Sequence, residues 1–325
     1  MARSDLLLAL VQYGISGDRG LFRRAVEALI AEERAQQHNV LADNLAKLLK
    51  EASKLSRTLP ATNGEGVQNL IYEITPRKRL TDLILSPVVQ RACSELMEEH
   101  HRQELLRSHN LEPRNRILLV GPPGNGKTSL AEAIADSLMV SLIGVRYDGV
   151  IGSFLGETAS RLRKLFDYVR TRHCVLFFDE FDTLGKERGD PHDTGEIKRV
   201  VSSLLLQIDE LPSHVVVVTA TNHPELLDRA VWRRFQLRLQ LPKPTHQQVK
   251  RWFESLQKRI DFPLAYGPSA LASHFKGASF SELEDFSADL LRRWVLSVPD
   301  VDPKRIVREQ LEQWDKRFEP TSNKP

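Results

Sequence analysis

The periodicity of hydrophobic and polar positions divides the chain into three stretches. Over residues 1–56, apolar side chains recur at helical spacing and predict short amphipathic helices, which can bury their apolar stripes only against one another. From residue 81 onward, helical patterns alternate with short β-branched runs. After residue 242 no strand pattern remains, and only helices are predicted. The pattern therefore predicts a small helical bundle, a mixed α/β domain and a second helical unit.

The middle stretch is typical of a parallel sheet with helices on both faces, since strands that alternate with helices join through helical crossovers. The runs predicted as strands are residues 117–120, 142–145, 175–178, 215–219 and 235–241. Turn residues at 58–66 and a basic run at 77–79 indicate a linker. We therefore divide the chain into a helical bundle expected to dock a partner or substrate (1–56), a linker (57–80), a large α/β subdomain (81–242), a small helical lid subdomain (243–318) and a polar tail (319–325).

Composition argues against several classes of protein. With 41% hydrophobic and 27% charged residues the chain is ordinary for a soluble protein, and a net charge of +3 is too small to indicate nucleic-acid binding. The two cysteines, Cys93 and Cys174, have no metal-ligand or redox spacing, which suits a reducing cytoplasm. No segment is long enough to cross a bilayer, and the apolar run at 6–11 is too short for a signal peptide. We expect a cytoplasmic protein without a membrane segment.

A glycine-rich loop after the first predicted strand carries the strongest chemical signal. Residues 121–128 read GPPGNGKT and fit GxxxxGK[ST] between a strand and a helix, the context that this phosphate-binding pattern requires. Backbone N–H groups would surround the phosphates, Lys127 would reach the β- and γ-phosphates, and the Thr128 hydroxyl would ligate Mg²⁺. The candidate nucleotide-binding residues are Gly121, Pro122, Pro123, Gly124, Asn125, Gly126, Lys127, Thr128 and Ser129.

Polar residues follow two further predicted strands. Asp179 and Glu180 come directly after the apolar run 175–178, and Asn222 follows the run at 215–219 closely. Ligands of open α/β sheets bind at the carboxyl ends of the strands, so we expect these side chains at one site. Asp179 would hold Mg²⁺, Glu180 would act as general base on the attacking water, and Asn222 would lie between that water and the γ-phosphate.

Together these motifs resemble the AAA+ ATPases, and within them the classical AAA clade, over about two thirds of the chain. Residues 121–128 are similar to the Walker A motif, residues 178–182 to Walker B, and Thr221-Asn222 to sensor 1. The resemblance implies a P-loop NTPase fold, ATP and Mg²⁺ as ligands, and ATP hydrolysis as the reaction.

Residues 227–235 resemble the family segment that supplies arginine fingers to a neighbouring subunit. The family usually has a Pro-Gly between its two arginines, whereas Arg233 and Arg234 are adjacent here, which leaves open which of them touches the γ-phosphate. Two cations on a rigid turn can neutralise charge that develops in the transition state. Arginines supplied in trans imply a homo-oligomeric ring, a hexamer in most of the family.

The resemblance also assigns roles to loops. Residues 279–283 resemble the lid motif that touches the nucleotide base and ribose, and residues 82–85 are expected to line the adenine pocket. Phe154, Leu155 and Gly156 occupy the place of a pore loop, where an exposed aromatic between glycines can grip an extended polypeptide. The alternative is that Phe154 packs into the core. A second pore loop is expected within residues 189–195.

Three functions remain to be weighed. The first is protein remodelling, in which ATP turnover drives pore loops that pull on a polypeptide. The second is a regulatory switch for a partner enzyme, because the layout resembles bacterial stand-alone ATPases paired with a subtilisin-like serine protease in plasmid-incompatibility or antiviral defence modules. The third, DNA remodelling, is disfavoured by the near-neutral charge and by the lack of a nucleic-acid recognition motif.

Overall fold

The computed structural model describes residue 26 and residues 28–30, 67–150, 155–184, 194–260, 263–297 and 302–317. The chain divides into two compact units, residues 1–64 and 65–325. In the first unit Val26, Leu29 and Ile30 are helical and buried. The other residues of the predicted N-terminal bundle, and the predicted polar tail, lie outside the described residues, so these two assignments remain predictions.

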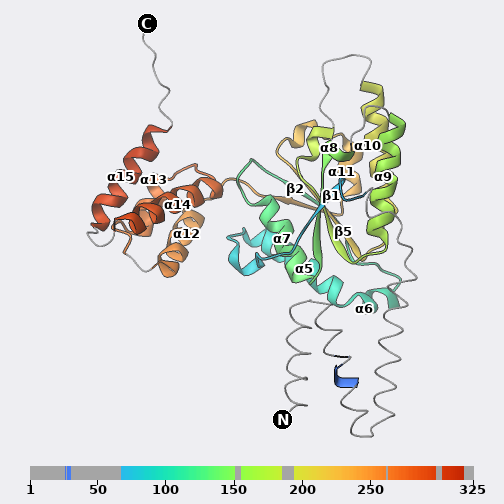
Figure 1. The fold of residues 1–325 in the computed structure, drawn as a ribbon, viewed down its shortest axis with the longest axis horizontal. Helices are drawn as coiled ribbons and strands as arrows, with labels where there is room; N and C mark the ends of the chain where they lie inside the picture. Colours follow the sequence, from blue (N-terminus) through green and yellow to red (C-terminus); the bar gives the residue numbers. More distant parts are fainter. Residues whose placement is uncertain are drawn as a thin grey trace. The chain divides into compact units, whose positions relative to one another are not determined.

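The second unit contains a six-stranded sheet with the order β1-β3-β4-β5-β2-β6, in which all neighbours are parallel except the β1–β3 pair (Figure 1). This arrangement confirms the α/β class, because each parallel strand is reached through a crossover. The strands are β1 (Ile71–Ile74), β2 (Arg116–Val120), β3 (Ser141–Val145), β4 (Cys174–Phe178), β5 (Val215–Thr221) and β6 (Leu237–Gln240).

Strand β1 was not predicted, because it lies in the segment interpreted as a linker. It is only four residues long and pairs antiparallel with β3 at the edge of the sheet. Tyr72 packs over Gly144 of β3, where an added Cβ atom would come within 2.1 Å of the tyrosine ring. Residues 71–74 of the expected linker therefore belong to the sheet.

Helices cover both faces of the sheet, as expected for buried parallel strands. Side chains of each central strand alternate between two core clusters; in β4, for example, Leu176 faces one cluster and Phe177 the other. The first cluster includes α8 (Tyr147–Val150), α9 (Leu155–Arg170), α10 (Thr194–Asp209) and α11 (Arg229–Arg234), and the second includes α5 (Pro87–His101) and α7 (Lys127–Ser137). Short helices α6 (Gln103–Ser108), η1 (Leu80–Asp82), η2 (Phe181–Leu184) and η3 (Pro224–Leu226) complete this part.

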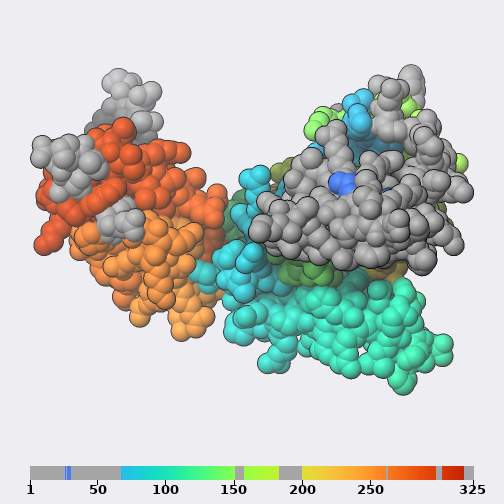
Figure 2. Space-filling view, turned by 60° about the horizontal axis from the view of Figure 1, so that its bottom comes forward, coloured from blue at the N-terminus to red at the C-terminus, as the bar shows by residue number. Residues whose placement is uncertain are grey.

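The chain beyond β6 is helical, as predicted. Its core includes Phe253, Phe275, Phe286 and Trp314, whose rings contact one another. Figure 2 shows these helices as one contiguous body coloured orange to red. They are α12 (His246–Arg259), α13 (Pro268–His274), α14 (Phe280–Leu296) and α15 (Pro303–Lys316), of which the last was not predicted as a separate helix. In the described ranges, every helix is too short or too polar to cross a membrane.

Candidate functional site

The carboxyl ends of β2, β4 and β5 meet at one edge of the sheet. The three strands are neighbours, with Val120 opposite Thr221 and Phe178 opposite Thr219. The loops that follow them enclose a cavity of about 320 Å³, as the predicted site requires. Its lining is Pro123, Gly124, Gly126, Lys127, Thr128, Ser129, Asp179, Glu180, Asn222, Phe280, Ser281 and Glu284. The predicted Gly121, Pro122 and Asn125 belong to the same loop but do not line this cavity.

Two glycines give the loop its shape. Gly126 precedes α7 with a φ of 85°, a left-handed conformation that side chains disfavour, and so turns the chain directly into the helix. At Gly121 an added Cβ would lie 2.1 Å from the backbone oxygen of Leu241. The loop also holds itself together, since the buried Asn125 donates through Nδ2 to the carbonyl of Pro122 at 3.2 Å. The result is a helix N-terminus open to the cavity, which favours a bound phosphate.

Lys127 is buried at the floor of the site, with 6% of its surface exposed. Its Nζ donates to the carbonyl oxygens of Gly121 at 2.7 Å and Pro122 at 3.0 Å, and to Oδ1 of Asn222 at 2.6 Å. Burial lowers the pKa of Lys127, and three nearby carboxylates act in the opposite direction; these belong to Asp179, Asp182 and Glu180. A buried ammonium held this way is available to a polyphosphate.

Oxygen atoms suited to Mg²⁺ come together beside this lysine. The Thr128 hydroxyl donates to Oδ2 of Asp179 at 3.1 Å across the two strand ends. Hydroxyl and carboxylate oxygens are the ligands that Mg²⁺ prefers, so the residues present fit a magnesium ion that also contacts phosphate. Glu180 is in the left-handed region with a φ of 49°, a backbone strain of order 1–3 kcal/mol that clusters at functional sites. Its amide donates to Oδ1 of Asp179 at 3.0 Å.

Asn222 is positioned through the last residue of β5. The buried Thr221 donates from Oγ1 to Oδ1 of Asp182 at 2.9 Å, and the same hydroxyl accepts the amide of His223 at 3.0 Å. Asp182 is 2% exposed. The buried carboxylate of Asp182, in the Walker B segment, thus accepts a hydrogen bond from Thr221 and holds the strand end that precedes Asn222. This role of Asp182 was not predicted, although the ends of both strands were expected at one site.

Comparison with known proteins agrees with this geometry. The family model described as "ATPase family associated with various cellular activities (AAA)" matches residues 117–243. The AAA family ATPase y4kL of Sinorhizobium fredii is 35% identical over 303 residues, which cover 91% of this chain and 90% of that protein. The chain belongs to the AAA family of ATPases. It binds and hydrolyses ATP, as the Walker motifs predict.

Other relatives of this AAA ATPase are matched over a smaller part of their length. The cell division cycle protein 48 homolog of Archaeoglobus fulgidus is 38% identical over 165 residues, which are 48% of this chain and 22% of that protein. A putative 26S proteasome regulatory subunit homolog of Methanothermobacter thermautotrophicus is 28% identical over 235 residues, which are 69% of this chain and 62% of that protein.

The lid helix α14 of the AAA ATPase begins at the nucleotide cavity. Ser279 and Glu282 form a capping box, and the amide of Ser281 donates to the carbonyl of Gly124 at 2.9 Å. Phe280 and Ser281 line the cavity, as the lid motif predicted, and Glu284 was not predicted. Residues 82–85, expected at the adenine pocket, are absent from its lining; Ile84 instead packs against the core cluster of α12–α15.

The two arginines at the end of α11 have different surroundings. Arg234 forms an ion pair with Asp209. Arg233 is exposed, and within the described part of the chain it has neither a hydrogen bond nor an ion pair. Neither arginine lines the nucleotide cavity of its own chain. Of the two arginines, only Arg233 therefore has an unpaired side chain in the described part of the chain.

The predicted pore loops lie mostly outside the described residues. Phe154 and residues 189–193 are among those not described. Helix α9 begins at Leu155, earlier than predicted, so Leu155 and Gly156 are in its first turn. An ion pair of 2.6 Å between Glu157 and Arg161, one turn apart, stabilises this start.

Two features beside the site were not predicted: the contacts of residues 77 and 78 with α7, and the burial of the Tyr147 hydroxyl. The basic run at 77–79, interpreted above as part of a linker, is docked on α7: Glu132 accepts the amide of Arg77 at 2.8 Å, and Lys78 Nζ donates to Oγ of Ser129 at 2.8 Å. Near the same site, and separate from these contacts, the hydroxyl of Tyr147 is buried without a hydrogen-bond partner in the described structure. Burial raises the pKa of Tyr147 well above its ordinary value, and the carboxylates of the Walker B segment add to this.

Proposed function

We propose that this AAA ATPase is a magnesium-dependent, ring-forming motor, a hexamer in its working state, that remodels protein substrates. Arg233 of each copy would complete the active site of its neighbour. A ring is supported by the separation between the residues that line the nucleotide cavity and the arginine expected to act in hydrolysis. Lys127, Asp179, Glu180 and Asn222 line one cavity, whereas the exposed Arg233 is not part of it and has no partner in the described chain.

Each residue then has a role in hydrolysis. Lys127 would leave its carbonyl partners to bind the β- and γ-phosphates, and Thr128 and Asp179 would hold Mg²⁺. Bound there, the ion neutralises charge on the phosphate oxygens. Glu180 accepts a proton from the attacking water, and Asn222 orients that water. Arg233 from the neighbouring copy neutralises charge in the transition state, an effect of about 10³–10⁵ in rate for arginine fingers.

The names of matched relatives support the hypothesis that the substrate is a protein. Two matched proteins have names that refer to proteasome regulatory subunits, which points to polypeptides as the class of client. We assign the grip on the client to Phe154, whose loop follows β3 in the sequence. The N-terminal bundle would recruit the client or a partner protein, and a subtilisin-like serine protease in a defence module is one such partner. In this proposal, any proteolysis belongs to the partner.

The ring is tested by turnover as a function of protein concentration. ATPase activity per chain should rise with concentration together with the sedimentation of a hexamer. Arg233→Ala should lower kcat by about 10³-fold or more while ATP binding persists. Arg229→Ala, at the exposed start of the same helix, is the matched control and should change little. A monomer in saturating Mg·ATP with full activity would exclude the ring.

Remodelling is tested with a hydrolysis-deficient trap. Glu180→Gln in ATP should retain a client protein, and the double variant with Phe154→Ala should lose it. If the same single partner is retained whether or not Phe154 is present, the regulatory-switch hypothesis is supported instead. If the protein binds a DNA duplex and the affinity falls steeply with added salt, the DNA-remodelling hypothesis is supported instead.

A further inference from the structure

The turn that follows the finger helix is tied to the sheet on both sides of one buried residue. Phe235 is 1% exposed and meets Phe181 edge-on, with ring centroids 6.3 Å apart. Directly before it, Arg234 pairs with Asp209; directly after it, Gln236 bonds to the start of β2. Arg233 is the last residue before these three anchors. Its position therefore depends on them.

Asp209 joins two arginines from different segments. It is the last residue of α10, and its Oδ1 accepts from Nη1 of Arg116 at 2.6 Å while its Oδ2 pairs with Arg234. The three side chains are only 24–31% exposed, so solvent screens these pairs less than it would at an open surface. The C-terminus of a helix also carries partial negative charge, which attracts both guanidinium groups. The carboxylate thus links α11 to the strand that leads into the phosphate loop.

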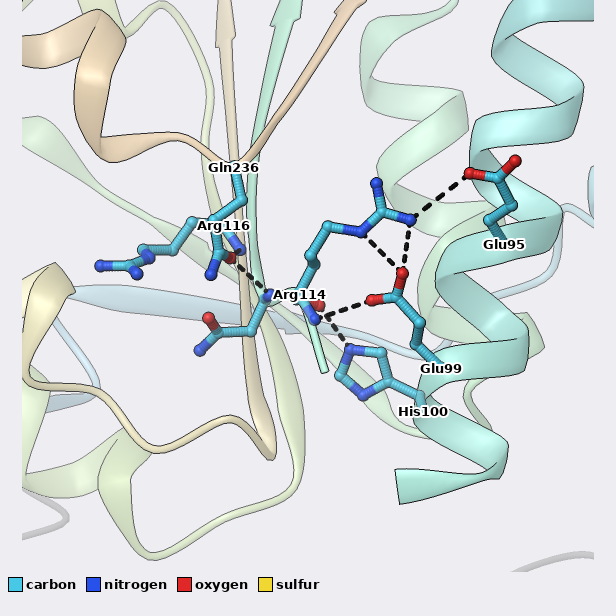
Figure 3. Close-up of polar contacts among 7 residues, drawn as sticks. Glu95, Glu99, His100, Arg114, Arg116 and Gln236 are labelled. Atoms are coloured by element: carbon cyan, nitrogen blue, oxygen red, sulfur yellow. Dashed lines mark hydrogen bonds and ion pairs between the residues drawn. The ribbon is translucent and has the colours of Figure 1, made fainter. Parts of the chain in front are cut away.

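Gln236 makes a second link to the same strand. Its Oε1 accepts the amides of Asn115 at 2.9 Å and Arg116 at 3.1 Å, and its own amide donates to the carbonyl of Arg116 at 3.0 Å. Arg114 is in turn held on α5, where Glu99 accepts from its Nε at 2.7 Å (Figure 3). Figure 3 shows this chain of contacts running from α5 through residues 114–116 to Gln236. The start of β2 is therefore held by contacts with α5, and it in turn holds Gln236 in place.

Adjacent residues of a helix point about 100° apart. With Arg234 held toward Asp209, Arg233 is directed elsewhere, and it is the exposed one of the two. We infer that Asp209 is a positioning residue for the arginine finger. Its ion pair keeps Arg234 from acting as the finger, and it fixes the turn from which Arg233 reaches the neighbouring copy. The inference rests on the proposed function, since it assumes that Arg233 acts in trans.

The inference is tested by complementation between inactive subunits. Glu180→Gln supplies Arg233 but cannot hydrolyse, and Arg233→Ala can hydrolyse only if a neighbour supplies the arginine. The two variants are disassembled without nucleotide and mixed, and ATP turnover should return when Mg·ATP is added. Asp209→Ala is then added either to the Glu180→Gln donor or to the Arg233→Ala acceptor. A misplaced catalytic group loses on the order of 10²-fold, so we expect the rescued turnover to fall about 10- to 100-fold with the donor only.

A structural role would give a different result. If Asp209 only stabilises its own fold or its own phosphate loop through Arg116, the loss appears equally in donor and acceptor, or in the acceptor alone, and the inference is overturned. Glu210→Gln in the donor is the matched control: the neighbouring carboxylate pairs with Arg170 at 2.7 Å, away from α11, and rescue should be unchanged. If Asp209→Ala does not fold, Asp209→Asn keeps the volume and removes the charge.

The proposed function and the inference fail in distinguishable ways. If the parent donor and acceptor give no rescue although both bind ATP and assemble, Arg233 does not act in trans and the ring hypothesis itself fails. If the parent pair is rescued and the Asp209→Ala donor rescues equally well, only the positioning role is wrong. ATP affinity of Asp209→Ala, measured by titration with a fluorescent nucleotide, should equal that of the parent in the supported case.

Discussion

The ammonium of Lys127 donates to Oδ1 of Asn222 at 2.6 Å, so the phosphate-binding lysine and the predicted water-orienting amide are hydrogen-bonded to each other. With two loop carbonyls as further acceptors, all three N–H groups of this lysine are engaged. A γ-phosphate that takes the ammonium would release Asn222. In the proposed mechanism the released amide then turns to the attacking water, and this would couple phosphate binding to the assembly of the hydrolytic site.

This coupling gives the first prediction. Asn222→Ala should lower kcat by about 10²-fold, because an oriented polar group at the reacting water is lost. ATP affinity should stay the same or increase, because Lys127 no longer has to leave this partner. Titration with a fluorescent nucleotide and steady-state turnover measure the two effects. His223→Ala, at the adjacent exposed position, is the control, and weaker ATP binding by Asn222→Ala would contradict the coupling.

Glu180 should separate binding from hydrolysis. Glu180→Gln keeps the size of the side chain but replaces an acceptor oxygen by an NH2 group and removes the base, so turnover should fall by about 10²–10⁴-fold while ATP stays bound. Phosphate release and nucleotide retention after gel filtration measure this. Glu225→Gln, an exposed carboxylate on η3, should behave as the wild type. Full turnover by Glu180→Gln would remove the assigned role.

Thr128 should set the magnesium requirement. Its hydroxyl and the Asp179 carboxylate are already 3.1 Å apart, so the ligands are pre-assembled. Thr128→Ala should raise the Mg²⁺ concentration for half-maximal turnover about tenfold, the size of a lost ligand-supporting interaction. Ser137→Ala, at the other end of α7, is the control because its hydroxyl only caps the carbonyl of Ala133. An unchanged magnesium dependence would argue against Thr128 as a ligand.

The nucleotide-binding face of the site could be predicted from the sequence because its residues follow strand ends. The loop 121–128, Asp179 and Asn222 each come at or just after the end of a buried apolar run, and parallel strands bring such ends to one edge. The local pattern therefore contains the geometry. The lid motif was predicted from its resemblance to the family, and the structure adds that Ser279 and Glu282 form a capping box.

Other parts depend on packing between distant segments and could not be predicted. Lys78 and Ser129 are 51 residues apart, and the docking of the basic run becomes visible only once α7 is folded. The pairing of Asp209 with Arg234 likewise depends on where α10 ends relative to α11. Strand β1 has only four residues and no crossover helix, so neither its length nor its context distinguishes it from a loop.

Lys78 gives the last prediction, because its ammonium donates at 2.8 Å to the hydroxyl of Ser129, which lines the nucleotide cavity. An exposed cation beside a polyphosphate is worth about 0.5–1 kcal/mol, so Lys78→Ala should raise the Kd for ATP about two- to fivefold. The effect should shrink as salt is added, since solvent ions screen an exposed charge. Arg79→Ala, the adjacent exposed cation, is the control: its backbone amide donates to the carboxylate of Asp82 at 3.0 Å and its carbonyl accepts the amide of Asp82, and the substitution leaves both groups in place. If the two variants weaken ATP binding equally, the effect is one of overall charge. If neither does, the contact with Ser129 serves only to dock the segment that leads into the sheet.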